Sequence, residues 1–62
     1  MTRRQIETLQ WVAEGKSTED IAIILNISPE TVKKQIEAAR EKLNAVNRAH
    51  AVAKAIRAGF IQ

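Results

Sequence analysis

Lys33, Lys34 and Glu37 carry charged groups that can hydrogen-bond the edges of nucleic-acid bases. A lysine ammonium can donate to O6 and N7 of guanine, and a glutamate carboxylate can accept from N4 of cytosine. In a helix, residues three or four positions apart lie on one face, so Glu37 would share a face with both lysines. We therefore predict that these three residues face bases in a DNA major groove.

A second group of polar residues surrounds these three in the sequence and is suited to phosphate oxygens. Hydroxyl, amide and cationic side chains supply most contacts to the DNA backbone, and the free amides of a helix N-terminus attract anions. We expect phosphate contacts from Lys16, Ser17, Thr18, Thr31, Gln35 and Arg40.

The same charged residues also fit a solvated helix surface. Glu30–Lys34 and Glu37–Arg40 have the spacing of ion pairs along one helix. For an arbitrary amphipathic helix that interpretation would be preferred, but the segment that precedes these residues favours DNA contact.

That segment, residues 18–43, has the pattern of a helix-turn-helix. Asn26 ends a short helix at a point that needs a left-handed residue, which Asn tolerates. Ser28 is a suitable N-cap for the next helix and Pro29 suits its first position. Ala22 is small where the two helices must cross. A second helix held in this way typically enters a major groove.

Capping signals and helical periodicity extend the prediction to the whole chain, which we take as one domain, residues 1–62. Thr2, Ser17 and Asn47 are expected N-caps, and Gly15, Asn44 and Gly59 are expected stops. Apolar residues follow helical spacing, so we predict an all-α, four-helix bundle-like domain with helices at 3–14, 18–25, 29–43 and 48–58. The expected core includes Leu9, Val12, Ala13, Val32, Ile36, Ala39 and Leu43, with Trp11 at its edge and Phe60 and Ile61 folded back onto it.

The fourth predicted helix is apolar nearly all round. Its polar positions in the helix body are His50, Lys54 and Arg57, and we place His50 on the surface or against a phosphate. A helix of this kind is usually buried on two sides, of which the domain core can cover only one. We expect a second copy of the chain to cover the other side, through Ala49, Val52, Ala53 and Ile56.

Composition excludes several classes of protein. The 62 residues contain no Cys, one His and a net charge of +3, with a pI near 9.8. We therefore expect no metal, no cofactor and no catalytic role, and a polyanionic partner.

No apolar run approaches the roughly 20 residues of a membrane span, and the lack of Cys suits the cytoplasm. Gly15-Lys16-Ser17 lacks the upstream Gly and strand of a phosphate-binding P-loop.

Taken together, these residues resemble the LuxR-type DNA-binding domain of bacterial transcription regulators. The matching segments cover essentially the whole chain: Thr2–Gln5, Leu9–Ser17, Ile21-Ala22, Ile27-Ser28, Thr31–Lys33, Lys42–Asn44, Asn47-Arg48 and Ala51–Ile61. Trp11, Gly15–Ser17 and the stretch from Lys42 to Arg48 resemble the quorum-sensing branch, which responds to acyl-homoserine lactones.

The resemblance implies that the third helix enters the major groove and that the fourth pairs with a second copy. By position it implies base contacts from Lys33, Lys34 and Glu37. Many family members have His at the position of Gln35, and several have a basic residue in place of Glu37. A Glu is common where this chain has Gln5, so a salt bridge expected there becomes at most a hydrogen bond.

We interpret the chain as a sequence-specific DNA-binding domain that acts as a homodimer on a two-fold symmetric site. Any small-molecule signal would bind a domain absent from this chain. The chain itself is either a domain excised from a larger regulator or a stand-alone member of the family. The main alternative is a protein-interaction module, which Glu30, Glu37 and Glu41 would favour. RNA is disfavoured because its major groove is too narrow for a helix. The sequence leaves open the operator, the direction of regulation and the oligomeric state off DNA.

Overall fold

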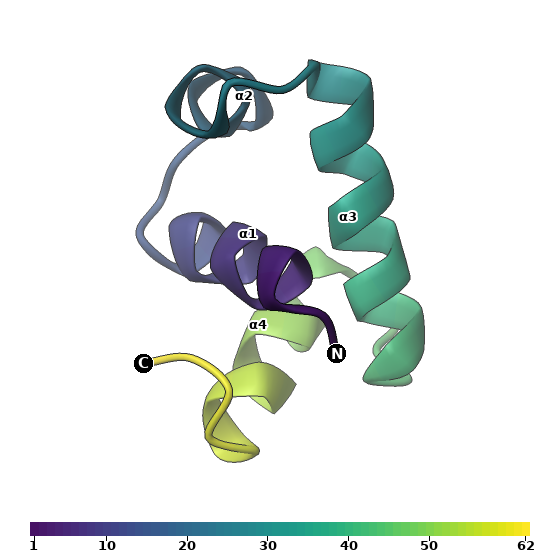
Figure 1. Cartoon of the computed structure of the whole chain (residues 1–62). Helices are drawn as coiled ribbons and strands as arrows, with labels where there is room; N and C mark the ends of the chain where they lie inside the picture. Colours follow the sequence, from purple (N-terminus) through teal and green to yellow (C-terminus); the bar gives the residue numbers. More distant parts are fainter.

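The computed structural model describes all 62 residues and contains four helices and no strand (Figure 1). The helices are α1 (Arg3–Ala13), α2 (Thr18–Leu25), α3 (Pro29–Lys42) and α4 (Arg48–Arg57). Each boundary lies within one residue of the sequence prediction, so the all-α class is confirmed.

Local hydrogen bonds explain where the helices begin. Thr2 and Gln5 form a reciprocal capping box: the Thr2 hydroxyl accepts from the Gln5 amide and Gln5 Oε1 accepts from the Thr2 amide, both at 3.1 Å. Ser17 and Asp20 form the same arrangement at the start of α2. Each cap satisfies amides that a helix leaves unpaired, and replacing such a residue with Ala costs about 1 kcal/mol.

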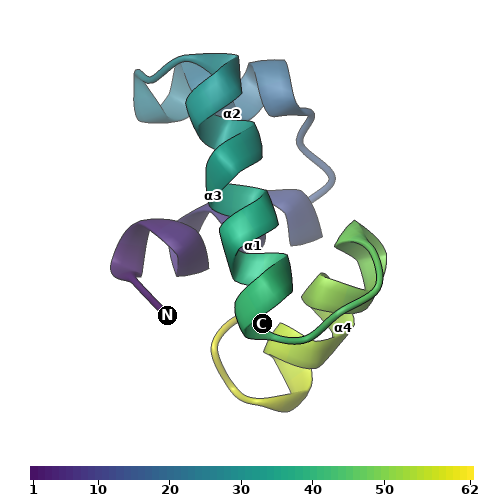
Figure 2. The ribbon, with the colours of Figure 1, turned by 90° about the vertical axis from the view of Figure 1, so that its right-hand side faces the viewer.

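The longest helix, α3, organises the other three. Figure 2, with α3 in front, shows α2 across its N-terminal end and α4 beside its C-terminal end. α3 makes contacts with α1, α2 and α4, and α1 also contacts α4. The side of α3 that faces the viewer in Figure 2 is therefore left uncovered by other helices.

Two groups of buried side chains hold α3 at its two ends. The first, here called the helix-turn-helix cluster, consists of Ile21, Ala22, Val32 and Ile36 and joins α2 to α3. The second, here called the α4 cluster, joins α1, α3, α4 and the C-terminal segment through Leu9, Ala39, Ala45, Ala51, Ala55 and Ile61.

The apolar positions predicted for the core are confirmed with two refinements. Trp11 and Val12 are half-buried and pack against the helix-turn-helix cluster, whereas Ala13 packs against the α4 cluster. Ile61 folds back onto the core as expected, but Phe60 is 41% exposed and its predicted burial is wrong. Gly59, at φ +80°, turns the chain after α4 and brings only Ile61 inward. No helix has the length and apolarity that a bilayer span requires.

Candidate nucleic-acid interface

The turn between α2 and α3 has the geometry that the sequence predicts. Asn26 lies in the left-handed region, with φ 56° and ψ 47°, and the Ile27 amide donates to the Ala22 carbonyl at 3.0 Å. Ser28 caps α3 by accepting from the Thr31 amide at 3.1 Å, and Pro29 occupies the first helical turn. These local contacts fix the angle at which α3 leaves α2.

The first turns of α3 separate buried from exposed residues cleanly. Val32 and Ile36 face the helix-turn-helix cluster, whereas Lys33, Lys34 and Glu37 are exposed. Neither lysine has a hydrogen-bond or ion-pair partner within the protein. The three predicted base-facing residues are therefore available at the surface.

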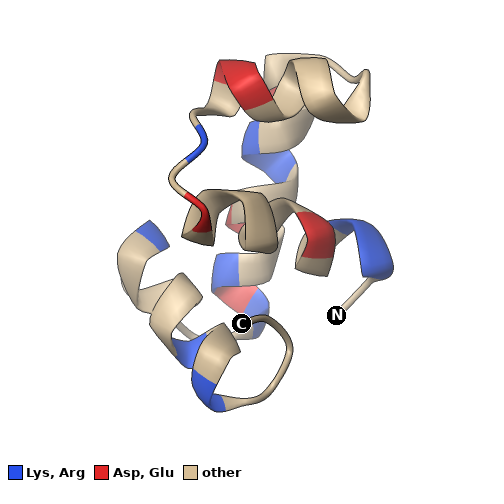
Figure 3. Cartoon of the chain, turned by 90° about the vertical axis from the view of Figure 1, so that its left-hand side faces the viewer, with Lys and Arg blue, Asp and Glu red and all other residues tan.

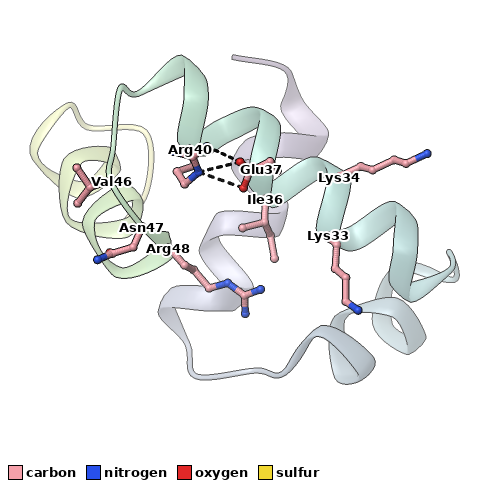
Figure 4. Close-up of a pocket in the computed structure, with 8 residues that line it drawn as sticks. All are labelled: Lys33, Lys34, Ile36, Glu37, Arg40, Val46, Asn47 and Arg48. Carbon is pink, nitrogen blue, oxygen red and sulfur yellow. Dashed lines mark hydrogen bonds and ion pairs between the residues drawn. The ribbon is translucent and has the colours of Figure 1, made fainter.

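These residues line one wall of an open groove of about 630 Å³ (Figure 4). The lining residues come from α3 and from the turn into α4: Lys33, Lys34, Ile36, Glu37, Arg40, Val46, Asn47 and Arg48. Four of the eight are cationic and one is acidic, so the groove has a positive balance that suits a polyanion.

The start of α4 is the part of this groove that the sequence prediction missed. Asn47 caps α4 by accepting from the His50 amide at 2.8 Å, and Arg48 extends from the first position of that helix toward α3 (Figure 4). The Asn47-Arg48 pair at the start of a predicted helix is the sequence feature that could have indicated this part of the groove. Its place beside α3, however, depends on how the chain turns between residues 43 and 47.

Glu37 and Arg40 are bound to each other. Arg40 Nε donates to Oε1 and Oε2 of Glu37, both at 3.0 Å, and its Nη2 also contacts Oε1. On its other side, Arg40 Nη1 donates to the Ala45 carbonyl at 2.7 Å. The hydrogen bonds from Arg40 hold the pKa of the Glu37 carboxyl below its ordinary value. Of the two ion pairs expected along α3, this one forms and Glu30–Lys34 does not.

The residues expected to contact phosphate are not all gathered in the groove. Arg40 lines it but donates to protein acceptors, and Thr31 shares a 2.8 Å hydrogen bond with the Ser28 hydroxyl. Gln35 is half-buried on α3.

The start of α2 forms a separate surface. Thr18 is only 8% exposed, so of the three residues predicted to contact phosphate here only Lys16 and Ser17 have accessible side chains. Lys16 lines a different depression with Asp20 and two exposed isoleucines. The first turn of α2, which begins two residues after Lys16, carries two acidic residues (Figure 3). A phosphate at this end of α2 would meet Lys16 beside two carboxylates.

The four residues expected at a dimer surface differ in exposure. Ala49 and Ile56 are exposed, Ile56 by 47%, and Ala53 is half-buried. Val52 is also half-buried and packs against the α4 cluster, so part of its side chain already belongs to the core.

The polar residues of α4 stabilise the turn that precedes it. His50 Nδ1 accepts from the Val46 amide at 3.1 Å. Lys54 Nζ donates to the carbonyls of Leu43 and Asn44 at 3.0 and 3.1 Å, which satisfies acceptors at the end of α3. The half-buried His50 thus has a structural partner. No group of three or more His, Cys, Asp or Glu residues is placed to hold a metal.

Residues 1–55 match the family described as bacterial regulatory proteins, luxR family. The chain belongs to this family. Its sequence is 48% identical over 61 residues to the transcriptional activator protein VanR of Vibrio anguillarum, covering 98% of the chain and 25% of VanR. It is 47% identical to the quorum sensing-dependent transcriptional regulator RpaR of Rhodopseudomonas palustris, covering 100% of the chain and 26% of RpaR.

Solved structures agree with this assignment. The transcription factor GerE superposes with a TM-score of 0.96 at 34% identity, covering 100% of this chain and 92% of that one. VqmA from Vibrio cholera, solved with ligand and DNA, gives a TM-score of 0.88 at 30% identity over 97% of this chain and 26% of VqmA. The chain spans about a quarter of the length of the curated relatives it matches. The family is one of regulatory proteins, in agreement with the expectation of no enzymatic role.

Gln5 also makes a contact between two helices. Lys42 Nζ donates to Gln5 Oε1 at 3.3 Å, joining the end of α3 to the start of α1. The contact is a hydrogen bond because the Gln5 amide carries no charge, which agrees with the expectation of at most a hydrogen bond at this position.

Proposed function

We propose that this LuxR-family domain binds double-stranded DNA sequence-specifically, with α3 in the major groove. The observation that carries the proposal is the exposed start of α3, where Lys33 and Lys34 have no protein partner and line the same groove as Arg48. Free cations on a protruding helix match the donors required for guanine edges and nearby phosphates. The structural neighbour VqmA was solved in complex with DNA, which supports DNA binding by a domain of this fold.

We further propose that the domain serves a transcription regulator of the quorum-sensing branch. Several relatives are described as transcriptional activators or as quorum sensing-dependent regulators. A signal such as an acyl-homoserine lactone would then bind outside the region of those relatives that this chain matches.

The protein-interaction alternative is weakened by the geometry of Glu37. That alternative rested on acidic residues along the exposed side of α3, but the Glu37 carboxylate is bound to Arg40. Its charge is therefore partly offset where phosphates would approach. Glu30 and Glu41 do not line the groove.

We propose that two copies pair through α4 on a two-fold symmetric site. Ile56 is the largest exposed apolar side chain of α4, with Ala49 and Ala53 nearby in sequence. Two short helices bury a small area, so the pair should form only on DNA, where adjacent half-sites raise the effective concentration. Ile56→Glu should abolish cooperative binding to paired half-sites and leave single half-site binding nearly unchanged. Unchanged cooperativity would exclude this face.

Selection of bound sequences from a random DNA pool tests the proposed function. The wild-type domain should enrich a sequence with two-fold symmetry and half-sites about 10 base pairs apart. Lys33→Ala or Lys34→Ala should relax the preference at one position, as expected for a base contact. Arg3→Ala, which removes the same charge outside the groove, is the matched control and should keep every preference. No enrichment, together with no binding to bulk DNA at low salt, would contradict the proposal.

A further inference from the structure

Arg40 differs from the other cations of the groove in how its donors are used. Lys33, Lys34 and Arg48 have no hydrogen-bond partner in the protein, whereas Arg40 donates to Glu37 and to the Ala45 carbonyl. The Arg40 side chain is only 27% exposed, compared with 57% for Glu37. Its guanidinium therefore connects an exposed carboxylate on α3 to the backbone of the turn that leads into α4.

This connection restricts the Glu37 carboxylate. An unrestrained Glu on a helix surface samples several rotamers, but both oxygens of Glu37 are held by the planar guanidinium fork. A carboxylate can accept about four hydrogen bonds, so acceptor sites remain on the side away from Arg40. Glu37 is thus presented to the groove as a fixed acceptor.

We propose that Arg40 is a positioning residue that sets a preference of Glu37 for cytosine at one base pair of each half-site. The inference rests on the proposed DNA binding. Cytosine presents the N4 donor in the major groove, whereas thymine presents an acceptor and guanine presents two. Adenine presents a donor beside the N7 acceptor, and N7 would repel the oxygens of a carboxylate. A Glu37 carboxylate held in one position discriminates between these arrangements of donors and acceptors, and a mobile carboxylate discriminates less.

The test is a double-mutant cycle with Glu37→Ala, Arg40→Met and the double variant, using site selection and affinity measurements on the four resulting proteins. Met keeps the apolar stem of Arg and removes every donor. The wild type should favour cytosine at one position by about fivefold, the lower end of the range for a specific base contact. Glu37→Ala should remove this preference, and Arg40→Met should reduce it with Glu37 still present. With Ala at position 37, Arg40→Met should not alter base preference.

The alternative roles of Arg40 predict different results. If Arg40 only stabilised the turn at Ala45, Arg40→Met would lower affinity equally for all sequences and leave the cytosine preference intact. If it bound a phosphate, Arg40→Met with Glu37 present would reduce the salt slope by about 1 and leave the cytosine preference intact. Either result would overturn the proposal.

Two controls make the outcome interpretable. Arg4 and Glu7 form an exposed ion pair at the same spacing on α1, 3.4 Å apart, and Arg4→Ala should leave all preferences unchanged. If Arg40→Met does not fold, Arg40→Lys replaces it: one ammonium cannot reproduce the planar fork, so the preference should still fall. A wild type that binds DNA with no cytosine preference overturns the Arg40 inference alone, whereas a wild type that binds no DNA contradicts the proposed function as well.

Discussion

The two ends of α3 are attached to the rest of the domain in different ways. At its N-terminal end, Ile21, Val32 and Ile36 interlock α3 with α2 through large aliphatic side chains. At its C-terminal end the buried contacts with α4 are mostly alanines, and the turn is fixed by side chains that bond to backbone groups. Apolar burial therefore secures the end that we propose enters the groove of DNA. Close helix approach and directed hydrogen bonds secure the other end.

The largest expected effect is at the N-terminal end. Ile36 is 4% exposed, and truncating a buried Ile to Ala costs about 2–5 kcal/mol. Small domains have only about 5 kcal/mol of stability, so Ile36→Ala should unfold a large fraction of the protein at room temperature. Circular dichroism melts measure this. Ile23→Ala, the same truncation at a side chain that is 80% exposed, should change stability by less than about 0.5 kcal/mol.

At the C-terminal end the sensitivity should be to added volume. Ala55 is fully buried where α4 meets the core, so Ala55→Leu should cost about 1–3 kcal/mol through overpacking. Ala58→Leu, at the exposed end of α4, serves as the control. Equal melting temperatures for the two variants would show that α4 can move away from the core without loss of stability. Small residues would then not explain this contact.

The polar bonds of the turn should contribute less. Lys54→Met removes the donor to the Leu43 and Asn44 carbonyls and keeps the aliphatic stem. A loss of about 1 kcal/mol is expected, which lowers the melting temperature of so small a domain by about 4–8 °C. Arg57→Met on the same helix removes an exposed charge and should leave the melting temperature nearly unchanged. If both variants melt like the wild type, the two hydrogen bonds from Lys54 do not stabilise the turn.

The smallest effect concerns pH. Hydrogen bonds from Arg40 lower the pKa of Glu37 in the folded state, so its contribution to stability is present above the ordinary Glu pKa. That contribution is lost as the pH falls through the lowered pKa. The melting-temperature difference between wild type and Glu37→Gln should therefore be largest near neutral pH and disappear in acid. A difference that grows in acid would mean that the pKa is raised instead.

The comparison of the two ends also shows what the sequence could predict. Caps such as Ser28, the left-handed Asn26 and the stripe through Val32 and Ile36 depend on neighbours within one or two helical turns. The conformation of these residues could therefore be predicted from sequence spacing alone. The exposed position of Lys33 and Lys34 follows from the same periodicity.

The features that the sequence did not predict depend on contacts across the turn from α3 to α4. The bond from Arg40 to the Ala45 carbonyl, and the approach of Arg48 to the groove, depend on the path of residues 43–47. Val52 was assigned to an outer surface, yet it packs partly inward against the α4 cluster, to which α4 itself contributes only Ala51 and Ala55. Helical periodicity does not specify how deeply such a helix sits.

The central claim is that the first turns of α3 contact base edges in the major groove. The most direct measurement combines Lys33→Ala and Lys34→Ala with a selected site in which each guanine in turn is replaced by 7-deazaguanine, which lacks the N7 acceptor. Replacement at the contacted guanine should weaken binding by the wild type, and it should cause no further loss for the variant that lacks the contacting lysine. Wild-type affinity that is unchanged by replacement at every guanine would contradict the claim.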